Sequence, residues 1–141
     1  MTEIKLLTEQ EFDKFIVLLK EINEEPLEPK MTERLKEDFA LGRYIGFLLY
    51  EKYQLAGLAV GVEAYSAVHA RRILNLDELY IRESFRRKGL GKILFDHVTE
   101  YAKSSGYLRL EWRTEKNNVA AKSLYSQYKT DTDWTYYVMK L

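Results

Sequence analysis

The chain has 141 residues, of which 46% are hydrophobic and 13% aromatic, enough to build the core of one ordinary domain. Its 22 basic residues balance 22 acidic ones, which argues against a nucleic-acid or membrane partner. The lack of cysteine excludes disulfides, thiolate metal sites and a cysteine nucleophile. The N-terminus lacks a signal-peptide pattern, and no apolar run approaches the ~20 residues of a membrane span. We therefore expect a single cytoplasmic domain over residues 1–141.

The N-terminal part of the chain predicts a strand followed by two helices. Residues 3–7 have the composition of a short strand. Thr8 and Glu11 then make a capping box, after which apolar residues at helical spacing continue to Ile22. Two prolines break this pattern before a second helix over residues 30–40, whose end is marked by a glycine.

The middle of the chain predicts three strands. Residues 44–50 and 55–61 are apolar runs separated by the polar EKYQ, which indicates a β-hairpin with buried strands. Residues 73–81 alternate in the same manner and lead into the cation cluster RRKGLGK. A cation cluster that runs into a helix start brings N–H groups and positive charge together, as a phosphorylated ligand requires.

The C-terminal part of the chain alternates helices with strands. From Leu90 the apolar spacing is helical as far as Gly106. Residues 108–112 then suit a strand, residues 117–127 a short helix, and residues 134–141 a final strand. The order is strand-helix-helix-strand-strand-strand-helix-strand-helix-strand. It predicts an α/β fold in which four helices cover a mixed, twisted sheet, because helices between late strands make part of the sheet parallel.

The cation cluster contains a glycine motif at the junction between a strand and a helix. Arg86, Gly89 and Gly91 form R-x-x-G-x-G, and glycines there let the backbone approach a diphosphate. A Rossmann loop does not fit because Leu94 stands in place of the third glycine, and a Walker A loop does not fit because Ile93 follows the lysine. Taken alone, the motif fits equally well a flexible turn with solvated cations.

A second motif makes the pattern more specific. NVAAKSLY, residues 118–125, follows the first motif about thirty residues later. The two together resemble the signatures of the GCN5-related N-acetyltransferase (GNAT) family, and the resemblance covers essentially the whole chain. It implies the GNAT fold, with six to seven strands, and an enzyme that moves the acetyl group of acetyl-CoA to a primary amine by direct attack in a ternary complex. RLEW and the terminal WTYYVMKL are similar to the branch of spermidine/spermine and thialysine acetyltransferases, which act on small amines.

The resemblance also implies where acetyl-CoA binds. The glycine loop would hold the diphosphate through backbone N–H groups and cations, and the alternative for each cation is surface charge. The strand before the loop would pair its main chain with the pantetheine arm, and Asn118 would bond to the ligand or act as a helix N-cap. The residues expected to bind acetyl-CoA are Leu79, Tyr80, Ile81, Arg86, Arg87, Lys88, Gly89, Leu90, Gly91, Lys92, Asn118 and Tyr125.

Acetylation of an amine needs a base and an acid. An amine with a pKa of ~10.4 is neutral in only about one molecule per thousand near pH 7.4, and Asp77 and Glu78 are the candidate bases, with Glu78 preferred. Because neighbours on a strand point to opposite faces, we expect at most one to face the site. Both could instead hold a cationic substrate or pair with Arg72 or Arg109. Tyr125 is the candidate acid for the leaving thiolate, and its alternative role is a ring that caps the core.

Several alternatives stay open. A noncatalytic acyl-CoA-binding module, or an acetyltransferase for a peptide amine, would carry the same motifs. The acidic residues 23–33 either attract a cationic amine or form a solvated loop. The family often forms homodimers, for which residues 134–137 are a candidate interface. We expect no metal, because His69 and His97 have no further His or Cys nearby.

Overall fold

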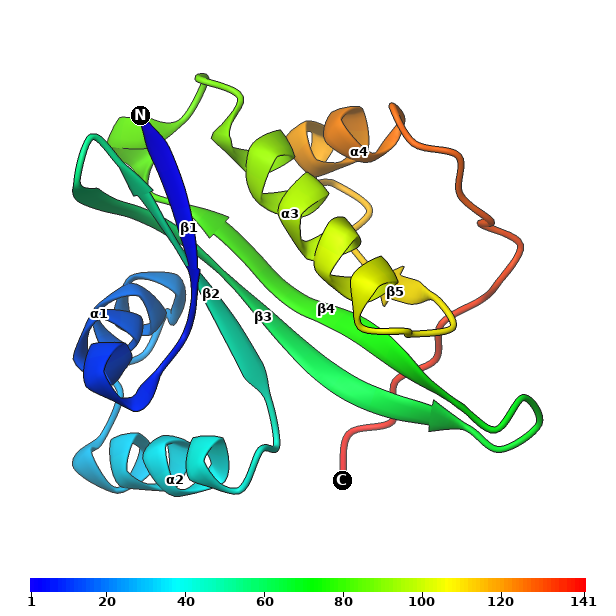
Figure 1. Ribbon diagram of the computed structural model, residues 1–141, viewed down its shortest axis with the longest axis horizontal. Helices are drawn as coiled ribbons and strands as arrows, with labels where there is room; N and C mark the ends of the chain where they lie inside the picture. Colours follow the sequence, from blue (N-terminus) through cyan, green and yellow to red (C-terminus); the bar gives the residue numbers. More distant parts are fainter.

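The computed structural model describes residues 1–141 as a twisted five-stranded sheet flanked by helices (Figure 1). The strands lie in chain order across the sheet: β1 (Thr2–Leu6), β2 (Ile45–Glu51), β3 (Gln54–Ser66), β4 (Arg71–Ile81) and β5 (Leu110–Trp112). The helices are α1 (Phe12–Ile22), α2 (Pro29–Ala40), α3 (Leu90–Ser104) and α4 (Val119–Tyr125), with short 3-10 turns at Glu9–Glu11 and Glu83–Phe85. None of the helices combines the length and apolarity that crossing a membrane requires.

The sheet is mixed, as the sequence predicts. The first four strands pair antiparallel, and β4 and β5 pair parallel. A parallel pair needs a crossover connection, which α3 supplies. The tight turn between β2 and β3 places Lys52 and Tyr53 at φ values of 49° and 67°, the left-handed geometry that matches the twist of a short hairpin.

The alternation of side chains along each strand divides the core into two parts. In β2, Phe47 and Leu49 belong to the cluster that packs against α3, whereas Leu48 and Tyr50 belong to the cluster that packs against α1. The helices α1 and α2 accordingly lie on the opposite side of the sheet from α3 (Figure 1). Both faces of the central strands are therefore buried, which explains their nearly continuous apolar sequences.

The start of α1 differs from the prediction. The side chain of Thr8 makes no capping hydrogen bond, and a 3-10 turn precedes the helix. The carboxylate of Glu11 instead accepts a hydrogen bond from the Tyr50 hydroxyl and lies 3.9 Å from Lys5 Nζ and 3.6 Å from Lys14 Nζ. The prediction of a capping box was wrong because the Glu11 side chain, which would have completed the box, makes long-range contacts with the sheet instead.

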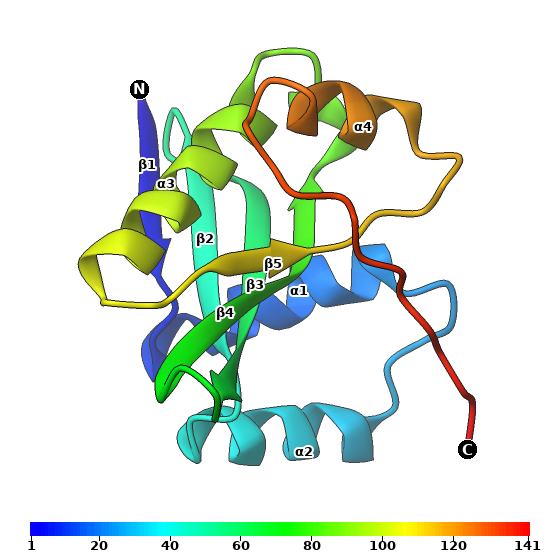
Figure 2. The ribbon, with the colours of Figure 1, turned by 90° about the vertical axis from the view of Figure 1, so that its right-hand side faces the viewer.

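The predicted final strand is also wrong. Residues 134–141 join no strand, so the sheet has five strands and not six to seven. Figure 2 shows this tail, in red, running from α4 past β5 without pairing. Trp134 and Tyr137 are 81% and 87% exposed. A strand requires a neighbouring edge to receive its backbone hydrogen bonds, and the apolar alternation of a sequence does not supply that edge.

Candidate active site

A long groove opens where β4 and β5 separate. The ladder between the two strands joins Leu74–Leu76 to Leu110–Trp112, and the part of β4 after Leu76 has no strand partner on that side. The groove has a volume of about 1590 Å³, and its walls come from the end of β4, the start of α3, α4 and the C-terminal tail. Single drug-sized ligands occupy about 300–1,000 Å³, so a groove of this size suits a longer, extended ligand.

The groove brings together almost all the residues predicted for the site. Every residue expected to bind acetyl-CoA lines it except Lys88, whose ammonium lies 5.5 Å from the centre of the Phe85 ring. The candidate bases Asp77 and Glu78 line it as well. Segments that are separated by up to about fifty residues in the sequence therefore meet around one space.

One end of the groove is a loop with free backbone donors. The N–H groups of residues 87–92 donate to no backbone carbonyl, because they precede or begin α3. Arg87 and Gly89 have φ values of 65° and 75°, and alternation of this kind turns successive N–H groups into a concave anion site. A Cβ atom on Gly89 would meet nothing within 4 Å, and one on Gly91 nothing nearer than 3.9 Å. The loop therefore leaves room for a diphosphate close to the main chain.

The cations of the loop are not equivalent. Arg86 Nε donates to the carbonyl oxygen of Ile81 at 2.8 Å, which folds the side chain back on the end of β4. Lys92 Nζ lies 2.7 Å from Asp96 Oδ2, one turn further along α3, and this pairing raises the pKa of the lysine. Arg87 lines the groove and makes neither a hydrogen bond nor an ion pair. It is the cation best placed to meet a phosphate.

The part of β4 that lines the groove contains a β-bulge. In the register of β3 with β4, Val60 lies opposite Glu78 and the next residue, Gly61, lies opposite Leu76, so Asp77 is the extra residue. A bulge breaks the strict alternation of side chains along a strand. Both Asp77 and Glu78 line the groove. The expectation that at most one of the two carboxylates faces the site stays a prediction.

The two carboxylates differ in their surroundings. Partial burial raises the pKa of Glu78, the negative charge of Asp77 raises it further, and Arg113 opposes both effects. Asp77 Oδ1 lies 3.8 Å from Arg113 Nη2. The partners suggested from the sequence were wrong: Arg72 and Arg109 each pair with a different glutamate, outside the groove.

Tyr125, the last residue of α4, also lines the groove. Its ring packs against those of Phe95 and Trp112, with both centroid distances 5.3 Å, and its hydroxyl makes no hydrogen bond to the protein. Burial raises the pKa of this phenol. The helix that carries it starts at Asn118, whose Oδ1 accepts a hydrogen bond from the N–H of Ala121 at 3.0 Å. Asn118 thus acts as an N-cap and fixes the start of α4.

Sequence reasoning did not assign several groove-lining residues to the site. Arg113 lines the groove, as do Trp134, Thr135 and Tyr136 of the C-terminal tail, and the guanidinium carbon of Arg113 lies 4.5 Å from the centre of the Tyr136 ring. The position of Arg113, directly after the strand that ends at Trp112, is a signal that could have identified it. The sequence of the tail contained no such signal. The tail lies at the groove because of the path that the chain takes after α4.

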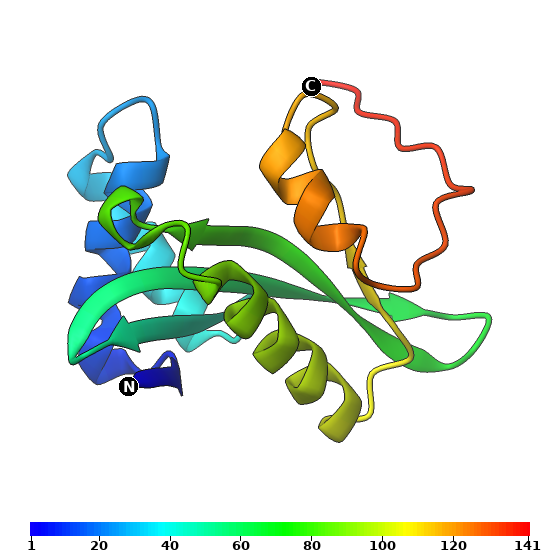
Figure 3. The ribbon, with the colours of Figure 1, turned by 90° about the horizontal axis from the view of Figure 1, so that it is seen from above.

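The two histidines lie outside the groove. His69 is in the turn between β3 and β4, at the opposite end of β4 from the glycine loop (Figure 3), and its Nδ1 lies 2.9 Å from Ser66 Oγ. His97 packs edge-on against Phe47. No three His, Cys, Asp or Glu side chains are grouped in a way that could hold a metal ion.

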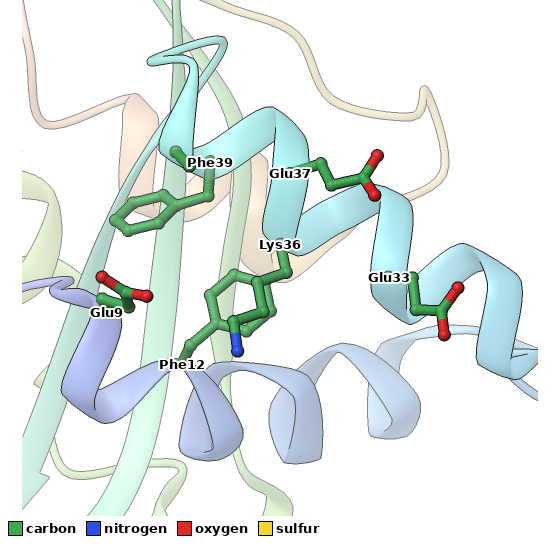
Figure 4. Close-up of a pocket in the computed structure, with 7 residues that line it drawn as sticks. Glu9, Phe12, Glu33, Lys36, Glu37 and Phe39 are labelled. Carbon is green, nitrogen blue, oxygen red and sulfur yellow. The ribbon is translucent and has the colours of Figure 1, made fainter.

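A smaller cleft of about 340 Å³ lies between α2 and the start of α1 (Figure 4). Its rings, Phe12 and Phe39, have centroids 5.7 Å apart. Of the acidic residues 23–33, Glu33 reaches this cleft and none lines the large groove. The acidic segment is mostly exposed and does not contribute to the groove, as expected for a solvated loop.

Comparison with known proteins identifies the family. Residues 12–128 match the Acetyltransferase (GNAT) family. The chain belongs to this family. The GNAT chain is 31% identical over 127 residues to the thialysine N-ε-acetyltransferase of Caenorhabditis elegans. The aligned residues make up 87% of this chain and 79% of that protein. It is 33% identical over 73 residues to the L-ornithine N5-acetyltransferase of Arabidopsis thaliana, covering 52% of this chain and 32% of that protein.

Solved structures agree on the fold of this GNAT protein. The ribosomal-protein-alanine N-acetyltransferase of Brucella melitensis biovar Abortus 2308 matches over 100% of both chains with a TM-score of 0.83 and 20% sequence identity. The predictions of a GNAT fold and of an N-acetyltransferase enzyme are thus confirmed. Members of the family generally use acetyl-CoA. A loop with free N–H donors, an unpaired strand edge and an unbonded phenol along one groove fit that cosubstrate.

Proposed function

We propose that this GNAT domain transfers the acetyl group of acetyl-CoA to a primary amine of a small molecule, by direct attack in a ternary complex. One observation carries the proposal: a single groove joins the free N–H groups of residues 87–92 to two carboxylates and the unbonded phenol of Tyr125. The relatives support a small acceptor, since the thialysine and L-ornithine acetyltransferases are named for small molecules that carry a side-chain amine.

In this proposal the cosubstrate lies along the whole groove. Its diphosphate accepts hydrogen bonds from residues 87–92 and meets the unpaired guanidinium of Arg87. The pantetheine arm follows the edge of β4 at Leu79 and Ile81, where no strand of the sheet pairs on the β5 side. A main-chain N–H directed at the thioester oxygen would stabilise the negative charge that develops there, a contribution commonly worth ~3 kcal/mol.

The proposed reaction uses one base and one acid. The lone pair of the neutral amine forms the new C–N bond at the thioester carbon, and the C–S bond breaks with its electron pair on sulfur. Glu78, directly or through water, takes the proton that the amine nitrogen loses. Tyr125 donates its phenolic proton to the departing thiolate, and its raised pKa keeps that proton in place beforehand. Asp77, beside Arg113, holds the ammonium form of the substrate.

The test is release of free CoA from acetyl-CoA with spermidine, putrescine, thialysine, lysine, aminoglycosides and peptide N-termini as acceptors. We expect release with at least one small amine. Tyr125→Phe should lower kcat by about 100-fold, as loss of a general acid does, with the Kd for acetyl-CoA almost unchanged. The matched control Tyr65→Phe removes an exposed hydroxyl outside the groove and should change neither value.

Three outcomes would argue against the proposal. Tight binding of acetyl-CoA without release in the presence of any acceptor would indicate a noncatalytic acyl-CoA-binding module. Release with peptides alone would indicate a peptide amine as the acceptor. Equal kcat values for Tyr125→Phe and the unmodified enzyme would remove Tyr125 from its proposed role as the acid.

A further inference from the structure

The acceptor end of the groove contains a cation that amine acetylation does not require. Arg113 directly follows β5 and lines the groove together with Asp77, Glu78 and Tyr125. The incoming amine is itself a cation in water, so a guanidinium next to its path opposes its approach. Some feature of the acceptor should therefore compensate for this charge.

The guanidinium of Arg113 is oriented but not satisfied. Its carbon lies 4.5 Å from the centre of the Tyr136 ring, a cation–π contact that favours a stacked orientation. Its only ionic contact is with Asp77 Oδ1 at 3.8 Å, too long for a hydrogen bond, and it donates no hydrogen bond to the protein. Arg82, by contrast, donates to both carboxylate oxygens of Glu21, at 2.7 to 3.1 Å. Arg113 thus keeps its donors available in a groove that is open to a ligand.

We propose that Arg113 forms a subsite for a carboxylate on the amine acceptor, so that the acceptor is an amino acid or a close analogue and not a polyamine. The inference rests on the proposed function and names the substrate class of the same groove. The planar guanidinium binds a carboxylate through two parallel hydrogen bonds. The reacting amine then lies at Asp77 and Glu78, and the carboxylate lies at Arg113.

The charge pattern separates the two substrate classes. An amino acid with a side-chain amine presents a cation to the carboxylates of Asp77 and Glu78 and an anion to Arg113. The diamine of the same chain length lacks this carboxylate and keeps both ammonium groups, so it brings two cations and no anion toward Arg113. The tail contributes through Tyr136, whose ring contacts the guanidinium.

The test compares acceptors that differ in the carboxylate: L-lysine with cadaverine, and L-ornithine with putrescine. The measurement is kcat/KM from CoA release at saturating acetyl-CoA. We expect the amino acid of each pair to be preferred by about ten- to hundredfold, the size expected for a charge-assisted pair of hydrogen bonds. Arg113→Gln should abolish this preference by lowering kcat/KM for the amino acids and not for the diamines. Arg113→Lys should retain part of it.

Further variants separate recognition from packing. Arg109→Gln is the matched control, because Arg109 pairs with Glu111 outside the groove, and it should keep the full preference. Tyr136→Leu should reduce the preference by removing the ring beside the guanidinium, whereas Tyr136→Phe should keep it.

The possible failures are distinguishable. If the unmodified enzyme acetylates the diamine of each pair as well as or better than the amino acid, the carboxylate subsite is overturned while the proposed transferase stands. Equal losses of kcat/KM on both members of a pair in Arg113→Gln would also overturn it, because they would show a purely structural role. If no amine supports CoA release although acetyl-CoA binds, the proposed function fails and the subsite fails with it.

Discussion

The two ends of the groove are built from different parts of the polypeptide. The end proposed for the diphosphate consists mainly of main-chain N–H groups from one continuous stretch, residues 87–92. The end proposed for the acceptor consists of side chains from four separate segments, among them Glu78, Arg113, Tyr125 and Tyr136. A main-chain site depends on the conformation of a loop, whereas a side-chain site depends on charge and on tertiary placement. Substitutions at the two ends should therefore affect different measured quantities.

The largest effect should come from the acceptor end. Glu78→Gln removes the proposed base, and we expect kcat/KM for the amine to fall by about 100-fold while the Kd for acetyl-CoA stays the same. Because the pKa of Glu78 is raised above the ordinary value of 4.5, the acid limb of the kcat/KM profile of the unmodified enzyme should lie above that pH. The variant should lack this limb. An unchanged pH profile in Glu78→Gln would assign the proton transfer to another group.

The same variant should become slightly more stable. A raised carboxyl pKa means that the folded protein binds the proton more tightly than the unfolded chain does. The free energy of unfolding therefore falls as the pH rises from 4.5 through the raised pKa of Glu78, and an ionised Glu78 disfavours the folded state at neutral pH. Glu78→Gln removes this penalty, so its Tm at neutral pH should be equal to or higher than that of the unmodified enzyme. A lower Tm would mean that Glu78 has a stabilising role.

The difference between the ends also explains what the sequence could predict. The glycine loop is a local motif, so its residues, its N–H groups and the helix that follows could all be inferred from one stretch. Most elements of the fold were also predictable from local sequence. The spacing of apolar residues within each segment indicates whether it forms a helix or a strand. Arg113 and Tyr136 could not be paired in advance, since they meet only after the chain has crossed the groove.

The errors in the fold have the same origin. The capping box failed because Glu11 bonds to Tyr50 on a distant strand, and the final strand failed because no edge receives residues 134–141. The β-bulge at Asp77 was missed because the alternation of the sequence does not show it. Each error concerns a feature that depends on residues far away in the chain.

The next largest effect should come from the conformation of the loop at the diphosphate end. Gly89 has a φ of 75°, and a β-branched residue there costs ~1–2 kcal/mol or moves the loop. Gly89→Val should therefore weaken the binding of acetyl-CoA by about five- to thirtyfold in calorimetry, with little change in kcat at saturation. Gly106→Val is the matched control, because Gly106 has a φ of 79° at the end of α3, away from the groove. It should lower Tm without changing the Kd, and a similar loss of affinity in both variants would show that the effect is global.

The smallest effects should distinguish two of the cations that line this end, Arg87 and Lys92. Arg87 has no protein partner, so Arg87→Gln should weaken acetyl-CoA binding by about threefold and reduce its dependence on salt, as expected for an exposed charge. Lys92 is already paired with Asp96 on its own helix, so Lys92→Gln should leave the Kd almost unchanged. It should instead remove an exposed i,i+4 ion pair and lower the Tm only slightly. Equal losses of affinity in the two variants would mean that Lys92 leaves Asp96 when the ligand binds, and that side chains contribute more at this end than its main-chain geometry indicates.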